Sequence, residues 1–97
     1  MWFGPVAKKP TTAQVAGLPY RIWIPVVSSN LAAVMFIPYD NRIAGDSNKL
    51  YIKFHGGAQY VYYNVRQQVW IDLMRAPSKG KFHWRKIRNV YSYQRIV

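Results

Sequence analysis

Cysteine and glutamate are both absent from this chain of 97 residues. Without cysteine the chain forms no disulfide, no thiolate metal site and no cysteine nucleophile, and a reducing cytoplasm fits this composition. The longest apolar stretches, IWIPVV and LAAVMFIPY, contain proline, and both are shorter than the ~18–20 residues of a membrane-spanning helix. No apolar stretch typical of a signal peptide follows Lys8 and Lys9. We therefore expect a cytoplasmic protein with no membrane partner.

Acidic residues are scarce. The chain has 14 lysines and arginines against three aspartates, Asp40, Asp46 and Asp72, which gives a formal charge of +11. Half of the basic residues lie in the last 23 positions, where no acid occurs. Such a surplus repels itself and attracts polyanions from a distance. The charge favours a nucleic-acid partner, and a basic protein without that role is the alternative.

Length and composition are those of a single small domain. Hydrophobic residues make up 51% of the chain, enough for a modest core. Prolines and glycines without a sustained period dominate the start, which predicts an extended or partly ordered N-terminal arm over 1–27 and a folded domain over 28–97. Residues 20–27 are a possible short strand, which Pro25 would confine to a sheet edge.

The centre of the sequence predicts a β-meander. Residues 30–39 are rich in apolar side chains and predict a first strand. In 49–55 apolar and polar residues alternate, as in a half-buried strand, and 58–63 would form the returning strand. Gly56 and Gly57 suit a two-residue hairpin turn. We expect an α+β fold: a three-stranded antiparallel meander packed on one helix, with a second short helix.

A two-residue turn fixes which side chains share a face of the hairpin. The inner face would carry Leu50, Ile52, Phe54, Val61 and Tyr63. The outer face would carry Lys49, Tyr51, Lys53, Tyr60 and Tyr62. Three tyrosines beside two lysines predict a surface that stacks on bases and holds phosphates. The alternative is that these tyrosines are structural and covered by other parts of the chain.

The segment after the hairpin predicts a helix over 65–76, with Asn64 as its cap. A core-facing stripe is expected on this helix, formed by Val69, Trp70, Leu73 and Met74. Pro77 ends the helix, and Ser78 is a suitable N-cap for a second one.

The start of the second helix predicts an anion site. Lys79 and Lys81 stand in its first turn, and free amides with two cations suit a bound phosphate. Gly80 between them would let an anion approach the backbone closely. A solvated basic turn is the alternative. Arg85, Lys86 and Arg88 would extend the basic patch, while Trp84 and Ile87 would pack on the domain.

Catalysis is not expected. His55 and His83 lie far apart in the sequence without the spacing of a metal site, and the cations around His83 would favour its neutral form. Asp40 and Asp46 are better explained as turn-capping residues than as an acid–base pair. No phosphate loop or nucleophile elbow is present. We expect no cofactor and no metal.

Several motifs in a fixed order resemble the KTSC domain, a family found at the C-terminus of some lysyl-tRNA synthetases and as stand-alone bacterial and phage-type proteins. The motifs are YD, LYIKFHGGAQYVYYNV, APSKGKF and IRNVYSYQRI. A Tyr-x-Tyr of that family falls on Tyr60 and Tyr62, and its later Ser-x-Gly falls on Ser78 and Gly80. The resemblance covers roughly 28–96. It implies the small α+β fold, and its fusion partner suggests RNA binding.

Three functions fit these observations. The first is a non-catalytic module for RNA or single strands, using the basic residues and sheet tyrosines. The second is a protein-interaction module of a phage or mobile element, whose basic face docks on an acidic partner. The third is a binder of a small phosphorylated ligand at the turn 78–81.

Overall fold

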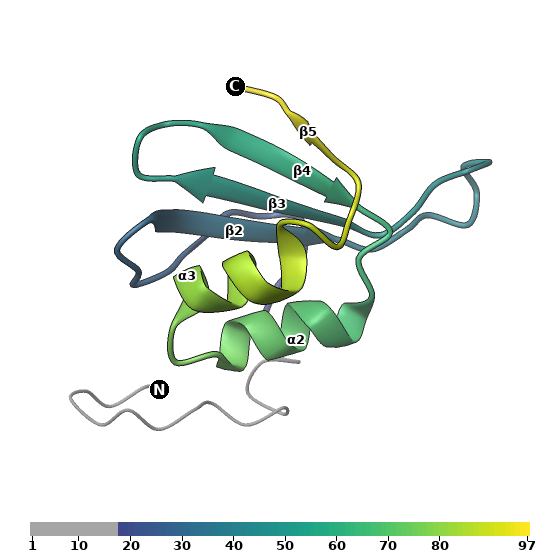
Figure 1. Ribbon diagram of the computed structural model, residues 1–97. Helices are drawn as coiled ribbons and strands as arrows, with labels where there is room; N and C mark the ends of the chain where they lie inside the picture. Colours follow the sequence, from purple (N-terminus) through teal and green to yellow (C-terminus); the bar gives the residue numbers. More distant parts are fainter. Residues whose placement is uncertain (1–17) are drawn as a thin grey trace.

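The computed structural model describes residues 18–97 (Figure 1). These residues form an α+β fold in which one antiparallel sheet of five strands, in the order β1-β2-β3-β4-β5, packs its inner face on the helices. The strands are β1 (Ile24–Pro25), β2 (Leu31–Ile37), β3 (Lys49–Phe54), β4 (Gln59–Tyr63) and β5 (Tyr93–Arg95). The helices are α2 (Gln67–Arg75) and α3 (Lys79–Phe82), the second continued by the π-helical turn η1 (His83–Ile87).

The α+β class is confirmed, but the expected number of three strands is wrong. The sheet gains a strand at each edge, because β1 pairs with β2 and β5 pairs with β4. Pro25, which lacks a backbone donor, lies in the edge strand β1 as expected. Of the predicted N-terminal arm, residues 1–17 lie outside the described residues. Within the remainder, the Tyr20 ring packs against Phe36, 5.7 Å between centroids.

The hairpin between β3 and β4 has a three-residue loop rather than the expected two-residue turn. The amide of Phe54 donates to the carbonyl of Ala58, and the amide of Gly57 donates to the carbonyl of Phe54, both at 2.9 Å. The loop is therefore His55, Gly56 and Gly57, and Gly57 has a φ of 98°. A tight turn followed by a left-handed glycine is the usual build of three-residue hairpin loops.

The extra loop residue shifts the strand register by one position. Leu50 pairs with Tyr62 and Ile52 with Tyr60, where the two-residue turn predicted Tyr63 and Val61. A shift of one residue turns every side chain of β4 to the opposite face. Tyr60 and Tyr62 therefore lie on the inner face, and Val61 and Tyr63 lie on the outer one. Their predicted placement was wrong, whereas that of the β3 residues is confirmed.

Helix α2 packs on the inner face of the sheet through the predicted stripe. Val69, Trp70, Leu73 and Met74 are all buried, and the Trp70 ring stacks on Phe36 with centroids 5.5 Å apart. The predicted capping role of Asn64 is wrong. The N-cap residue is Arg66, without a side-chain cap, and Asn64 takes the left-handed conformation at φ 58° where the chain leaves β4.

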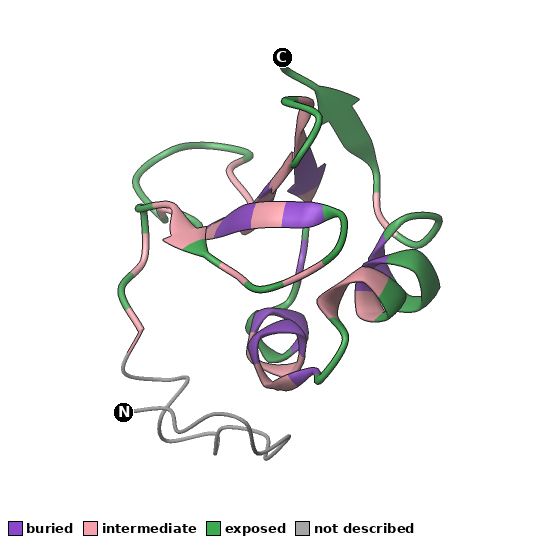
Figure 2. Cartoon of the chain, turned by 90° about the vertical axis from the view of Figure 1, so that its left-hand side faces the viewer, coloured by how far each residue is buried: buried purple, intermediate pink, exposed green. Residues whose placement is uncertain are grey.

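The helix formed by α3 and η1 is anchored to the sheet by a buried polar pair. The hydroxyl of Tyr62 and Nε2 of His83 lie 2.8 Å apart, and their side chains are 3% and 6% exposed. The Phe54 ring meets the His83 ring edge-on, and Ile87 is fully buried one turn later. Within η1 the amide of Arg88 donates to the carbonyl of His83. Figure 2 shows the outer side of this helix exposed, in green.

None of the helices formed by residues 18–97 has both the length and the apolar character needed to cross a membrane.

The two glycines of the hairpin loop differ in backbone conformation, so replacing them should have different effects on stability. Only Gly57 has a positive φ, and an added Cβ would meet nothing within 4 Å at either position. Gly57→Ala should therefore lower the free energy of unfolding by about 1–2 kcal/mol through backbone strain alone. Gly56→Ala should change it by less than about 0.5 kcal/mol. Urea unfolding measures both, and equal losses would instead indicate a two-residue turn, which strains both positions.

Burial and the nearby Arg88 charge lower the pKa of His83 to about 4. An unfolded histidine titrates near 6.5, so between these pH values the unfolded chain binds a proton that the folded chain does not. The stability that His83 contributes is fully present above pH 6.5 and is lost as the pH falls toward 4. The free energy of unfolding should drop over this range by at most about 3 kcal/mol.

Urea unfolding at pH 7.5, 5.5 and 4.5 measures this loss. His83→Gln should be less stable at pH 7.5 but should lack this pH dependence. His55→Gln serves as the control, because His55 is exposed and its ring contacts the carbonyl of Ser28 instead. A wild-type pH profile in His83→Gln would refute the assignment.

Candidate functional site

The outer side of the helix 79–87 carries a dense set of cations. The anchoring contacts of His83 and Ile87 turn one side of this helix toward the sheet, and the cationic side chains point the other way. We call this surface the basic face; its four members, all exposed, are Lys81, Arg85, Lys86 and Arg88. No Asp or Glu follows Asp72 in the chain, so no later acidic side chain neutralises these charges. The basic face is therefore a ready binding surface for phosphates.

Trp84 lies within the basic face and is 62% exposed. The guanidinium carbon of Arg88 lies 4.1 Å from the centroid of a Trp84 ring, a cation–π contact. We expected Trp84 to pack on the domain together with Ile87. That expectation is wrong for Trp84, because His83 and Ile87 occupy the inward positions and their spacing leaves Trp84 facing solvent. The spacing of four between Trp84 and Arg88 was the signal that could have shown this.

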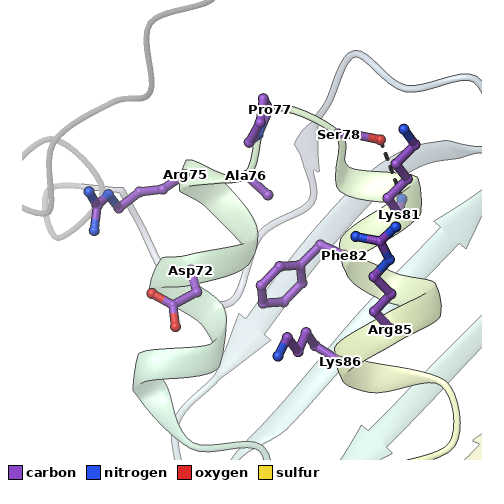
Figure 3. A pocket seen from close by; sticks show the side chains of 9 residues that line it. All are labelled: Asp72, Arg75, Ala76, Pro77, Ser78, Lys81, Phe82, Arg85 and Lys86. Atoms are coloured by element: carbon purple, nitrogen blue, oxygen red, sulfur yellow. Dashed lines mark hydrogen bonds between the residues drawn. The ribbon is translucent and has the colours of Figure 1, made fainter.

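A groove of about 410 Å³ separates α2 from the basic face (Figure 3). The Phe82 ring projects from α3 toward α2 and is half-buried, so the groove has an aromatic wall. Asp72 lines the groove on the α2 side, and three cations of the basic face line its other side. The full lining is Asp72, Arg75, Ala76, Pro77, Ser78, Lys81, Phe82, Arg85 and Lys86. Sequence reasoning missed the roles of Asp72, Arg75 and Phe82, since two helices had to be placed side by side to bring them together.

The anion site predicted at the start of the second helix is not formed as expected. The Ser78 hydroxyl does cap the helix, accepting from the amide of Lys81 at 3.4 Å. Lys79, however, folds back onto α2, and its ammonium donates to the carbonyls of Ala76 and Met74, at 2.9 and 3.3 Å. Burial lowers the pKa of Lys79 from its ordinary value. Lys79 thus caps the C-terminal end of α2 and is turned away from a ligand.

Packing inside the protein, rather than the predicted approach of an anion, explains why position 80 is a glycine. A Cβ at this position would lie 2.5 Å from Oδ1 of Asn30, which belongs to the segment before β2. The close approach at Gly80 is therefore to the chain itself and not to an anion. Of the predicted cluster, Lys81 alone keeps an exposed cation at the groove.

The predicted tyrosine surface on the sheet is divided between the two faces. Tyr62 is buried, and Tyr60 is half-buried against the rings of Phe54 and Tyr93. Tyr62 therefore has no open ring face for stacking on a base, and Tyr60 is partly covered by its neighbouring rings. Burial raises the pKa of Tyr62 to about 12, and the neighbouring Tyr60 and Tyr93 add to this shift.

The β3 members of that surface do lie together on the outer face. Tyr51 meets Trp23 edge-on with centroids 6.3 Å apart, and the Lys53 ammonium lies 4.6 Å from the centroid of the Trp23 ring. All three are half-buried. Lys49 instead pairs with the Asp46 carboxylate and also donates to the carbonyl of Ser47. Trp23 was missed because its segment was assigned to the arm.

The two acids of the loop after β2 close that loop, as expected. Asp46 accepts from the amide of Asp40 at 2.7 Å, and the Asp40 carboxylate holds Arg42. The bond from Lys49 lowers the pKa of Asp46 to about 2. In the part of the chain that the structure describes, no three histidine, aspartate or glutamate side chains are grouped to hold a metal ion.

Comparison with known proteins agrees with this fold. A protein of Tsukamurella paurometabola is 38% identical over 58 residues, which cover 60% of this chain and 76% of that protein. The crystal structure of a KTSC domain protein from Yersinia pestis superposes with a TM-score of 0.65 and 30% identity, covering 78% of this chain and 97% of that one. The family model of the KTSC domain matches residues 27–91, a span that includes the hairpin, α2 and the basic face. The chain therefore belongs to the KTSC domain family, as the order of its motifs indicated.

Proposed function

We propose that this protein is a non-catalytic module that binds single-stranded nucleic acid, RNA first, through the basic face rather than through the sheet tyrosines. The observation that carries the proposal is the exposed Trp84 set among four exposed cations. Cations that hold phosphates beside an aromatic ring that stacks on a base are the usual means of binding single strands. A cytoplasmic location is part of the same proposal and stays a prediction.

The aromatic ring is what favours a single strand over a duplex. A base inside a duplex presents its edges in the grooves and keeps its faces stacked, so Trp84 could stack only on an unpaired base. Trp84 is not among the residues that line the groove, but the next residue, Arg85, is, so a neighbouring nucleotide could enter the groove from the same helix. A surface made of cations alone would bind any polyanion, including a duplex, with little distinction.

An acidic protein partner is the competing function, because the same cations would attract acidic side chains. The burial of Tyr62 removes one argument for nucleic acid and so strengthens this alternative. A small phosphorylated ligand in the groove is the third possibility. Phosphate contacts and aromatic stacking respond differently to salt, and the next two experiments use that difference.

Phosphate contacts should show in the salt dependence of binding. For single strands, log K falls with log salt by about 0.7 for each phosphate contact. Lys81→Gln with Arg85→Gln should therefore lower the slope by about 1.4, measured by fluorescence anisotropy with a labelled nine-nucleotide RNA. The matched control is Arg66→Gln with Arg95→Gln, which removes two exposed cations that do not line the groove. An equal change of slope in both double variants would mean that only net charge matters, and the basic face would lose its role.

Stacking should show as a loss that does not depend on salt. Trp84→Leu keeps an apolar side chain but removes the flat ring, and affinity for the same RNA should fall by a free energy of about 1–3 kcal/mol with an unchanged slope. Tyr39→Leu is the control, since Tyr39 is also exposed but follows β2, outside the lining of the groove. If Trp84→Leu binds RNA like the wild type, the acidic-partner function becomes the better one.

A further inference from the structure

Asp72 is placed unlike the other two aspartates. Asp40 and Asp46 each form an ion pair inside the loop after β2, with Arg42 and Lys49. Asp72 belongs to neither of these two ion pairs. Asp72 lines the groove, and its Oδ1 accepts a hydrogen bond from the side-chain Nε2 of Gln68, one turn earlier on α2, at 2.9 Å. Gln68 thus holds a negative charge at a groove whose other charged lining residues are all cations, namely Arg75, Lys81, Arg85 and Lys86.

A carboxylate in that place would repel a phosphate that entered the groove. The part of a nucleotide that enters must therefore present hydrogen-bond donors toward Asp72, while its phosphates stay at the cationic rim. Nucleobases supply such donors on their Watson–Crick edges. Each carboxylate oxygen accepts more than one hydrogen bond, so the bond from Gln68 leaves both oxygens able to accept from a ligand.

Among the bases, guanine fits a carboxylate best. Its N1–H and its N2 amino group lie side by side on one edge, so they can donate to both oxygens of a carboxylate at once. Adenine and cytosine present one amino group beside an acceptor, and uracil presents one N–H between two acceptors. Paired, parallel bonds to a carboxylate add geometric selection as well as energy, as in the forked pairs that arginine makes.

The remaining walls of the groove suit a base and its phosphates. The half-buried Phe82 ring offers an apolar surface for a base. Lys81, Arg85 and Lys86 stand on the same groove to hold the flanking phosphates. The volume of about 410 Å³ lies within the range of small-ligand sites.

We propose that the groove between α2 and the basic face selects guanine in a single strand, with Asp72 accepting from the guanine edge and Phe82 contacting the base. This inference rests on the proposed function, single-strand binding, and deepens it by naming the base that the groove takes.

The test uses the full chain and nine-nucleotide labelled RNAs of uridine with one variable central base. With guanine at the centre, affinity by fluorescence anisotropy should be at least about fivefold higher than with adenine, cytosine or uracil, the lower end for a good bidentate pair. Inosine, which lacks the N2 amino group, should fall between guanine and uracil. This measurement needs only the wild-type protein.

Asp72→Asn then separates base selection from charge. Removing the negative charge should leave the RNAs with adenine, cytosine or uracil bound at least as tightly as before, while the guanine RNA loses its advantage over them. Asp40→Asn removes the same charge in the loop after β2 and should keep the preference. If the wild type binds all central bases equally, or if Asp72→Asn keeps the guanine preference, the inference is wrong and single-strand binding still stands. If the wild type binds none of the RNAs, the proposed function fails as well.

Discussion

The three-residue loop of the β3–β4 hairpin is the constraint on which the rest of the structure depends. It pairs Leu50 with Tyr62, and this pairing turns Tyr62 toward the helices. Had the loop been one residue shorter, Tyr62 would face outward, and His83 would lie in the core without its hydrogen-bond partner. A buried polar group left in that state costs about 1–3 kcal/mol. The loop and the helix 79–87 are thus linked through one hydrogen bond, although they are far apart in the sequence.

Contacts with the sheet, the Tyr62–His83 pair among them, stabilise the helix 79–87, whose own sequence disfavours a helix. Lys81 and Arg85 stand four residues apart, a like-charge spacing that weakens a helix. Cations are also unfavourable near a helix N-terminus. Three contacts offset this repulsion and stabilise the helix: the Ser78 cap, the burial of Ile87 and the Tyr62–His83 pair. Packing on the sheet therefore holds a helix whose outer side is suited to binding rather than to its own stability.

The sequence predicted the individual strands and helices better than their register and their packing against one another. Alternation gave the strands of the hairpin, and the spacing of Val69, Trp70, Leu73 and Met74 gave the buried side of α2. The register was missed because Gly56-Gly57 fits both a two-residue and a three-residue loop, and the choice between them is made by packing of Tyr62 on His83. Lys79 and Gly80 were misjudged for a similar reason, since their partners, the end of α2 and Asn30, are set by tertiary structure. The groove required both helices to be in place.

The positions of the three aspartates leave the basic face with an excess of positive charge. In a chain with a formal charge of +11, each of the three aspartates could have relieved repulsion on the helix 79–87. Two of them instead close the loop after β2, and the third is held by Gln68 at the wall of the groove. Asp72 can offset only part of the repulsion among the four exposed cations of the basic face, and a bound polyanion would turn the remainder into attraction. A ligand that binds only the folded state also stabilises it, so binding and folding would support each other. Under the proposed function, the repulsion on this helix is the counterpart of its affinity for phosphates.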